Sequence, residues 1–339
     1  MKRYCFLIIL IVLYYSAYAQ RADNFFRRID SGWGLSNNQV NTIFADSDGF
    51  LWLATVSGLN RYDSHSFKVF KNDPLDPSSL PENIITDIFE DHFGMLWLLT
   101  NNNCYIYNPE LESFGEAHLF FDLNPNFTRN GIRSLCADGQ GNTWIGNSST
   151  GLWLYDGSRS DLLHLYHDAD DADTPSSNRV MDVLMGDDGK VYVAHANGMV
   201  DVIDRTTRKV SQRIDMEVKA TFADGDKDFR LFVDSDQHLW LYGPRVGEEL
   251  YHYNPEQGQV LIFKAEGSGN EIRGVNISAV EEDDSGRIWV GTDHGGVYLL
   301  DKHTHKYSVL RNVPGDATSL SANSVTSLCK TDDGIIWVG

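Results

Sequence analysis

The stretch that decides the fold runs from Val40 to Asp63 and reads VNTIFADSDGFLWLATVSGLNRYD. Its first residues alternate as in a short strand, and a second apolar run surrounds Trp52. Between the two runs, Asp46 and Gly49 predict a tight turn, in which Asp accepts backbone hydrogen bonds and Gly takes a positive φ. Gly58 then opens a third run. The stretch therefore predicts three consecutive antiparallel strands, with a fourth in the residues that follow.

The same arrangement recurs through the rest of the chain. Its most regular member is an aromatic residue, and successive copies are 45, 47, 48, 48, 49 and 48 residues apart. The aromatic residues are Trp52, Trp97, Trp144, Tyr192, Trp240, Trp289 and Trp337. Because each position also recurs with its own turn and strand residues, the repeated Trp and Asp are interpreted as scaffold, with Trp between neighbouring blades and Asp holding the turn.

Four short strands in each of seven units, without a long helical period, predict an all-β, seven-bladed β-propeller with four-stranded blades. The last blade is expected to be truncated, because the sequence stops at Gly339, where a third strand should begin. The segment Phe25 to Ile29 resembles a stray fourth strand. It is expected to be extended and to lie near Ile336, at a poorly closed seam.

The N-terminus predicts export. Lys2 and Arg3 precede an uncharged apolar run, and Ala17 and Ala19 are the small residues of a signal peptidase site. The apolar run is shorter than the roughly 20 residues of a membrane-spanning helix. We therefore expect a cleaved signal peptide at 1–19 and a single propeller domain at 20–339.

Composition limits the classes of partner and cofactor. The formal net charge of −20 argues against nucleic-acid binding by this region. Three cysteines, Cys104, Cys136 and Cys329, remain after the signal segment, and this sparse, odd set is not a disulfide framework. The sequence has no CxxC motif or clustered His/Cys spacing, so no metal and no other cofactor is expected.

The unit V-x-x-I-x-x-D-x-x-G-x-L-W-x-x-T-x-x-G-L-x-x-Y-D resembles the two-component-regulator propeller repeat, as do the connections at 72–80 and 312–320. The likeness is greatest to the periplasmic sensor region of hybrid two-component systems of Bacteroidetes. That resemblance implies sensing of polysaccharide-derived glycans, or of their carrier, and pairing of two copies. It also implies further domains of the same receptor, among them an inner-membrane anchor and a histidine kinase.

Two other functions stay open, because fold alone does not decide function. A propeller glycosidase or lyase would need two positioned carboxylates, or an arginine cluster for an acidic sugar. Most candidate acids fall on the repeat's turns, and no GxSxG motif occurs, so we expect no catalytic activity in this fragment. A protein–protein interaction platform is the third class.

Ligand recognition is expected on the face that carries the loops between second and third strands, since these loops vary while the frame repeats. The candidate residues are Arg245, His294, His195 and Asn102. Arg245 lies in the longest of these loops, from Gly243 to Glu249, and offers a planar donor fork to a sugar hydroxyl pair or a carboxylate. For each of them, an ordinary solvated turn residue is the simpler alternative.

Overall fold

The computed structural model describes residues 25–339, apart from residues 102, 117–123, 125, 129–130, 158–160, 219–227, 244–248 and 264–274. The predicted signal peptide, 1–19, lies outside the described residues. Among the described residues, no helix has the length and apolar character needed to cross a membrane.

The first three blades are antiparallel sheets whose strands follow in chain order from the ring axis outward. A short 3-10 helix, Ser31–Trp33, precedes them. The first blade contains β1 (Val40–Ala45), β2 (Leu51–Thr55), β3 (Gly58–Tyr62) and β4 (Phe67–Phe70). The second contains β5 (Asp87–Glu90), β6 (Leu96–Leu99), β7 (Cys104–Asn108) and β8 (Ser113–Glu116). The third contains β9 (Ile132–Ala137), β10 (Asn142–Asn147), β11 (Gly151–Asp156) and β12 (Asp161–Leu165).

The next three blades repeat the same order. The fourth contains β13 (Val180–Met185), β14 (Val191–His195), β15 (Met199–Asp204) and β16 (Lys209–Asp215). The fifth contains β17 (Arg230–Val233), β18 (Leu239–Tyr242), β19 (Leu250–Asn254) and β20 (Gln259–Phe263). The sixth contains β21 (Val275–Glu282), β22 (Arg287–Asp293), β23 (Gly296–Asp301) and β24 (Tyr307–Leu310).

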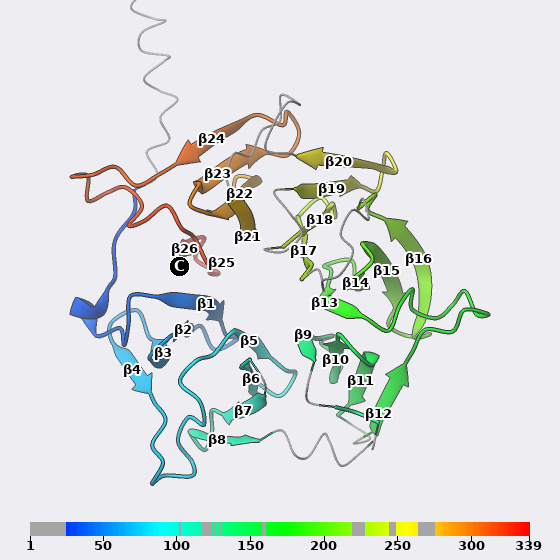
Figure 1. The fold of residues 1–339 in the computed structure, drawn as a ribbon, viewed down its shortest axis with the longest axis horizontal. Helices are drawn as coiled ribbons and strands as arrows, with labels where there is room; N and C mark the ends of the chain where they lie inside the picture. The colour runs from blue at the N-terminus through cyan, green and yellow to red at the C-terminus, as the bar shows by residue number, and fades with distance from the viewer. Residues whose placement is uncertain are drawn as a thin grey trace, which may run out of the picture.

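The seventh repeat forms only a two-stranded sheet, β25 (Leu328–Lys330) and β26 (Ile336–Val338). Within the described residues there are thus six four-stranded blades, so the expected count of seven blades is corrected to six, and the expected truncation of the last repeat is confirmed. The physical reason is that this repeat supplies only its first two strands. All-β architecture and four-stranded antiparallel blades are confirmed (Figure 1).

The repeated aspartate holds both a turn and an indole. Oδ1 of Asp46 accepts the backbone N–H groups of Asp48 and Phe50, and its Oδ2 accepts the indole N–H of Trp52 at 2.7 Å. The same Asp–Trp hydrogen bond recurs in the second, third, fifth and sixth blades. Gly49 has the positive φ, 85°, that the tight turn requires. The scaffold interpretation of both residues is therefore confirmed.

In the fourth blade, other residues form the hydrogen bond between the turn and the repeat's aromatic residue. Gly186 stands where the other blades have the turn aspartate, and Tyr192 replaces the tryptophan. The Tyr192 hydroxyl donates instead to Asp188, 3.0 Å away. A Cβ on Gly186 would lie 2.6 Å from the Tyr192 ring, so the tyrosine occupies the space that an aspartate side chain would need.

The seam between the first and sixth blades is closed along its inner strands. β25 lies between β1 and β21. Trp337 contacts the ring of Tyr62 edge-on at 5.8 Å, and Thr326 donates to the Val40 carbonyl at 2.7 Å. The expectation of a poorly closed seam is therefore wrong for the inner strands, because β25 and β26 pack against both neighbours.

The N-terminal segment covers the outer part of this seam. It runs along the rim between β24 and β4 (Figure 1). Phe26 donates its backbone N–H to Thr318 at 3.0 Å and packs in one cluster with Trp289 and Ile336. The predicted position beside Ile336 is confirmed and the segment is not helical, but it pairs in no sheet, so the predicted fourth strand is absent among these residues.

Candidate functional site

The loops between second and third strands share one face of the ring with the connections between blades. In the first blade Asn37 of the connection donates to Ser57 of the hairpin at 3.1 Å. In the fourth, the backbone N–H of Ala196 donates to the Arg179 carbonyl at 3.0 Å. Because the two loop sets are bonded to each other, this surface, called here the hairpin face, is a real feature of the molecule, as the sequence predicted.

His195 does not lie in a solvated turn. It is the last residue of β14, and its side chain is completely buried. Its Nε2 donates to Asp201 of β15 at 2.8 Å, and its buried Nδ1 has no hydrogen-bond partner. The turn interpretation of His195 is therefore wrong. The sequence analysis missed this burial because it assigned His195 to the loop after the second strand. The equivalent residues Thr55 and Thr292 are likewise completely buried strand residues.

Asp201 is the centre of this buried polar group. Its carboxylate accepts the backbone N–H and the hydroxyl of Ser176, each at 2.5 Å, and the Nε of Arg213 at 2.9 Å. Burial tends to raise the pKa of Asp201, but the hydrogen bonds from His195 and Ser176 outweigh it and hold the pKa to about 2. The carboxylate is therefore ionised at neutral pH.

A serine, a histidine and an aspartate together raise the question of nucleophilic catalysis. In a catalytic triad the histidine lies between the serine hydroxyl and the carboxylate, so that it can take the hydroxyl proton. Here Asp201 lies between Ser176 and His195, and the Ser176 hydroxyl donates to the carboxylate. The arrangement orders the junction of connection and hairpin, and it does not form a proton relay to Ser176.

His294 is an exposed residue of the hairpin face. It follows β22 with a φ of 72°, and 74% of its side chain is exposed. Its Nδ1 contacts Asp293 at 2.7 Å, and Asp293 also accepts the hydroxyl of Ser324 from the next connection at 2.8 Å. His294 is thus placed where a ligand on the hairpin face could reach it.

Arg245 and Asn102 lie outside the described residues. Next to Asn102, the described Asn103 donates to Glu82 at 2.9 Å, and the Tyr105 hydroxyl donates to the same oxygen at 2.8 Å. This group on the hairpin face of the second blade was missed by the sequence analysis. Asn103 and Tyr105 follow Glu82 by 21 and 23 residues, so the three side chains meet only when the connection folds over the hairpin.

Ion pairs also join blades that are not neighbours. Arg230 of β17 donates to Asp87 of β5 at 2.6 Å, which links the fifth and second blades. Arg133 of β9 lies 3.4 Å from Asp228, which precedes β17. β5 and β17 are the innermost strands of their blades (Figure 1), so the Arg230–Asp87 pair lies on the inner side of the ring. Asp87 and Arg230 each stand ten residues before the repeat's aromatic, a shared register that could have indicated this in the sequence.

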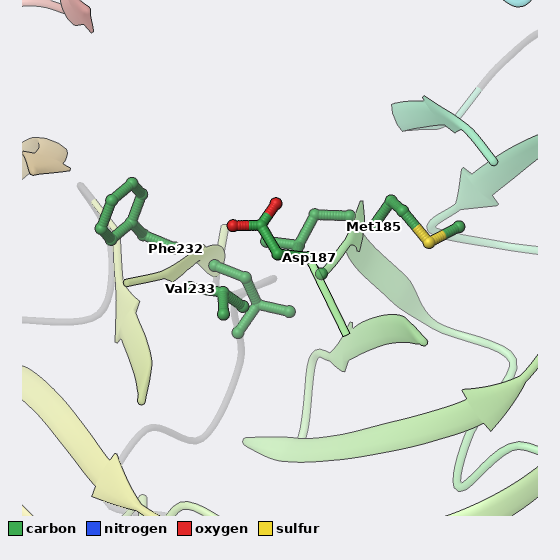
Figure 2. A pocket seen from close by; sticks show the side chains of 7 residues that line it. Met185, Asp187, Phe232 and Val233 are labelled. Carbon is green, nitrogen blue, oxygen red and sulfur yellow. The ribbon is translucent and has the colours of Figure 1, made fainter. Parts of the chain in front are cut away.

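A cleft of about 220 Å³ lies between the β13–β14 turn and β17. Figure 2 shows the Asp187 carboxylate in it, with Met185 on one side and Phe232 and Val233 on the other. This turn is at the end of the blade opposite the β14–β15 hairpin, so the cleft does not belong to the hairpin face. It lies beside Gly186, the position at which the fourth blade lacks the side chain of the turn aspartate.

Comparison with known families finds matches in four segments of the chain. Four segments, 34–57, 79–102, 271–294 and 319–339, match the two component regulator propeller family. A protein named Histidine kinase P4 from Formosa agariphila is 37% identical over 73 residues, which are 22% of this chain and 5% of that protein.

Solved structures show the same fold. The extracellular domains of the hybrid two component systems BT3049 and BT4673 from B. thetaiotaomicron each align with a TM-score of 0.68, at 21% and 19% identity. Each alignment covers 93% of this chain but only 40% and 38% of those chains, so this chain spans about two fifths of their length. The WD40 propeller domain of Doa1 aligns with a TM-score of 0.57 at 15% identity. This chain is a β-propeller, and four of its segments match the two component regulator propeller repeat.

Proposed function

We propose that this chain is an extracytoplasmic ligand-sensing region of a hybrid two-component sensor. The observation that carries the proposal is the match of four segments to two-component regulator propeller repeats, in a fold like that of extracellular domains of such systems. The proposal places the chain in the periplasm, in a receptor anchored in the inner membrane. Its partners are the receptor's further domains and, in the working state, a second copy.

The ligand class we propose is a polysaccharide-derived glycan, either free or presented by a carrier. The hairpin face supports this class, because hydrogen-bonding side chains gather there: His294 is exposed, and the carboxylate of Glu82 lies where connection and hairpin meet. Polar groups fixed by a rigid scaffold suit recognition of sugar hydroxyls. Arg245 of the longest hairpin loop supplies the proposed cationic contact.

Calorimetry with the purified chain and a panel of oligosaccharides tests the proposal. Binding should be weakened by about 1–3 kcal/mol in Arg245→Ala, if Arg245 makes a charge-assisted hydrogen bond. His294→Ala should weaken binding in the same direction. The matched control is His65→Ala, because His65 is exposed in the β3–β4 turn at the opposite end of the first blade.

The outcomes separate the three classes of function. Unchanged affinity of Arg245→Ala and His294→Ala together would remove the hairpin face from consideration. Turnover of a glycan that is lost on substitution of one carboxylate would contradict the sensor proposal in favour of an enzyme. Binding to a protein but to no glycan would favour an interaction platform.

A further inference from the structure

The fifth blade contains a buried group of three side chains that could act as metal ligands. Asp234 and His238 lie in the turn between β17 and β18, and His252 lies on β19, opposite Trp240. One ligand atom from each falls within 4.8 Å of the others, and the residues are 1%, 7% and 4% exposed. The group lies beside the sixth blade, whose Lys302 approaches Asp234 at 3.8 Å.

The separations between these atoms are compatible with ligation of one ion, although the two imidazoles lie within hydrogen-bond distance of each other. His252 Nε2 lies 3.0 Å from His238 Nδ1, and His238 Nδ1 lies 3.8 Å from Asp234 Oδ2. Zinc–ligand bonds of about 2.1 Å in a tetrahedral site place neighbouring ligand atoms ~3.4 Å apart. The two separations lie on either side of that value, and the 3.8 Å gap is too long for a hydrogen bond.

Other blades fill the same position differently. In the third blade Asn142 donates to the turn aspartate, Asp138, at 2.6 Å. In the sixth, Arg287 donates to Asp283 at 2.8 Å. His238 holds the equivalent place in the fifth blade, but its Nδ1 stays 3.8 Å from the carboxylate and is directed to His252. The gap is therefore a feature of the fifth blade and not of the repeat.

Surrounding contacts fix the ligand orientations. The Oδ1 atom of Asp234 accepts the backbone N–H groups of Asp236 at 2.9 Å and His238 at 3.0 Å. Its Oδ2 accepts the indole N–H of Trp240 at 2.9 Å, which leaves that oxygen a second lone pair. The ring of His252 stacks on Trp240 with centroids 4.0 Å apart. Such supporting contacts orient metal ligands in advance.

The charge around the group favours a cation of charge +2. Lys302 is almost fully buried and contacts Glu282 at 2.7 Å and Asp236 at 2.9 Å. Together with Asp234, these side chains carry three negative charges and one positive charge, a sum of −2. A divalent ion would balance that sum, while Lys302 keeps its contacts with Glu282 and Asp236.

We propose that Asp234, His238 and His252 bind a divalent transition-metal ion of the zinc type. One carboxylate oxygen and two imidazole nitrogens form a donor set suited to Zn²⁺, with a fourth position for another ligand. The ion joins the turn of the fifth blade to its third strand, next to the sixth blade. Its role is structural reinforcement of this blade, and it does not depend on the proposed sensor function.

The test uses the purified chain without a histidine tag, treated with EDTA and then titrated with Co²⁺ and Zn²⁺. We expect one Co²⁺ per chain, with the visible absorption of a tetrahedral nitrogen–oxygen site that Zn²⁺ abolishes. Saturating Zn²⁺ should raise the Tm, because an ion that binds only the folded state stabilises it.

Two variants taken from other blades keep the fold while removing a ligand. His238→Asn introduces the residue of the third blade, and His252→Leu introduces the leucine that faces the tryptophan as Leu154 and Leu299. Each should lower Co²⁺ affinity by at least about tenfold. His294→Ala, which removes an exposed histidine, should bind Co²⁺ as the unmodified chain does. Absence of one-to-one binding by the folded chain, or equal binding by folded ligand variants, would overturn the proposal.

Discussion

In the first blade Ser36 of the connection contacts Asn60 of β3, and in the fourth blade Ser176 occupies the same repeat position and contacts Asp201 of β15. The backbone N–H of each serine donates to the side-chain oxygen opposite, at 2.9 Å and 2.5 Å. The two serine hydroxyls differ in their role, because one accepts a hydrogen bond and the other donates one. The Asn60 amide donates to the Ser36 hydroxyl at 2.9 Å, whereas the Ser176 hydroxyl donates to the Asp201 carboxylate at 2.5 Å.

The neighbours of these residues differ in a matching way. Beside Asn60, Thr55 contacts the Ser36 hydroxyl at 2.8 Å, and Val69 lies opposite Asn60 on β4. Beside Asp201, His195 takes the place of Thr55, and Arg213 lies opposite on β16, where the first blade has the valine.

One backbone arrangement therefore accepts either a neutral or an ionised junction. Asn60 and Asp201 are both completely buried. Burying an ionised carboxylate is costly unless every oxygen is paired, so the change from Asn to Asp requires donors around it. His195 and Arg213 supply two of them. The two junctions should consequently differ in how much stability is lost when the central residue is removed, and in their response to acid.

The largest difference is expected on truncating the central residue. Asp201→Ala should lower the free energy of unfolding by about 3–5 kcal/mol, because it leaves the buried His195 and the Ser176 N–H without their shared acceptor. Urea denaturation followed by tryptophan fluorescence measures it. A loss below about 1 kcal/mol, the net value of one ordinary hydrogen bond, would mean that the ionised junction contributes little.

Acid should weaken the junction at Asp201 in the fourth blade and leave the junction at Asn60 in the first blade unchanged. Because the folded pKa of Asp201 is about 2, below its ordinary value of 3.8, its contribution is complete above the ordinary value and is lost as pH falls toward 2. The stability difference between the unmodified chain and Asp201→Asn should therefore shrink by roughly 2 kcal/mol between pH 5 and pH 2. The difference for Asn60→Ala should stay constant over the same range. Parallel pH curves for both variants would contradict the depressed pKa.

Truncating the central residue of the neutral junction should lower the free energy of unfolding by less. Asn60→Ala removes the acceptor of the Ser36 N–H, but Ser36 is only half-buried, so water can replace part of the lost bonding. We expect a loss of about 1 kcal/mol, at the low end for an unsatisfied polar group. Urea midpoints of Asn60→Ala and Asp201→Ala, compared at one pH, give the contrast directly. Equal losses would show that charge plays no part in it.

The repeat made the blades predictable, because its turn aspartate and its tryptophan bond to each other within one blade. Asp46 and Trp52 are six residues apart and bond to each other, so their recurrence carries the turn, the second strand and the packing. The count of blades was predicted as seven with the last one truncated. It depends on how many strands the last repeat supplies, and β25 and β26 form only half a blade.

For the candidate site, the sequence predicted which face of the ring carries the loops, but not the contacts of the individual residues. The loop sets follow from strand order, which is fixed by the repeat, and this predicted the exposure of His294. The burial of His195 depends on contacts with Asp201 and Ser176, six and 19 residues away along the chain, and the first blade has Asn60 in place of this aspartate. For the same reason His238 and His252, 14 residues apart, did not suggest a pair until β18 and β19 placed them together.

The smallest change in stability is expected from substituting Arg213 on β16, the strand that pairs with β15. Arg213→Val gives the fourth blade the residue of the first, and removes the 2.9 Å contact with Asp201 and a 2.8 Å bond to the Thr174 carbonyl. The Arg213 side chain is 35% exposed, so water screens its charge, and Asp201 keeps His195 and Ser176 as donors. We therefore expect a loss of only about 0.5 kcal/mol, in the range of exposed ion pairs, and a further decrease at high salt. Val69→Ala is the control, because Val69 makes no ion pair, and its small effect should not depend on salt. A salt-independent loss of several kcal/mol in Arg213→Val would mean that Arg213, rather than His195, is the main partner that keeps Asp201 ionised.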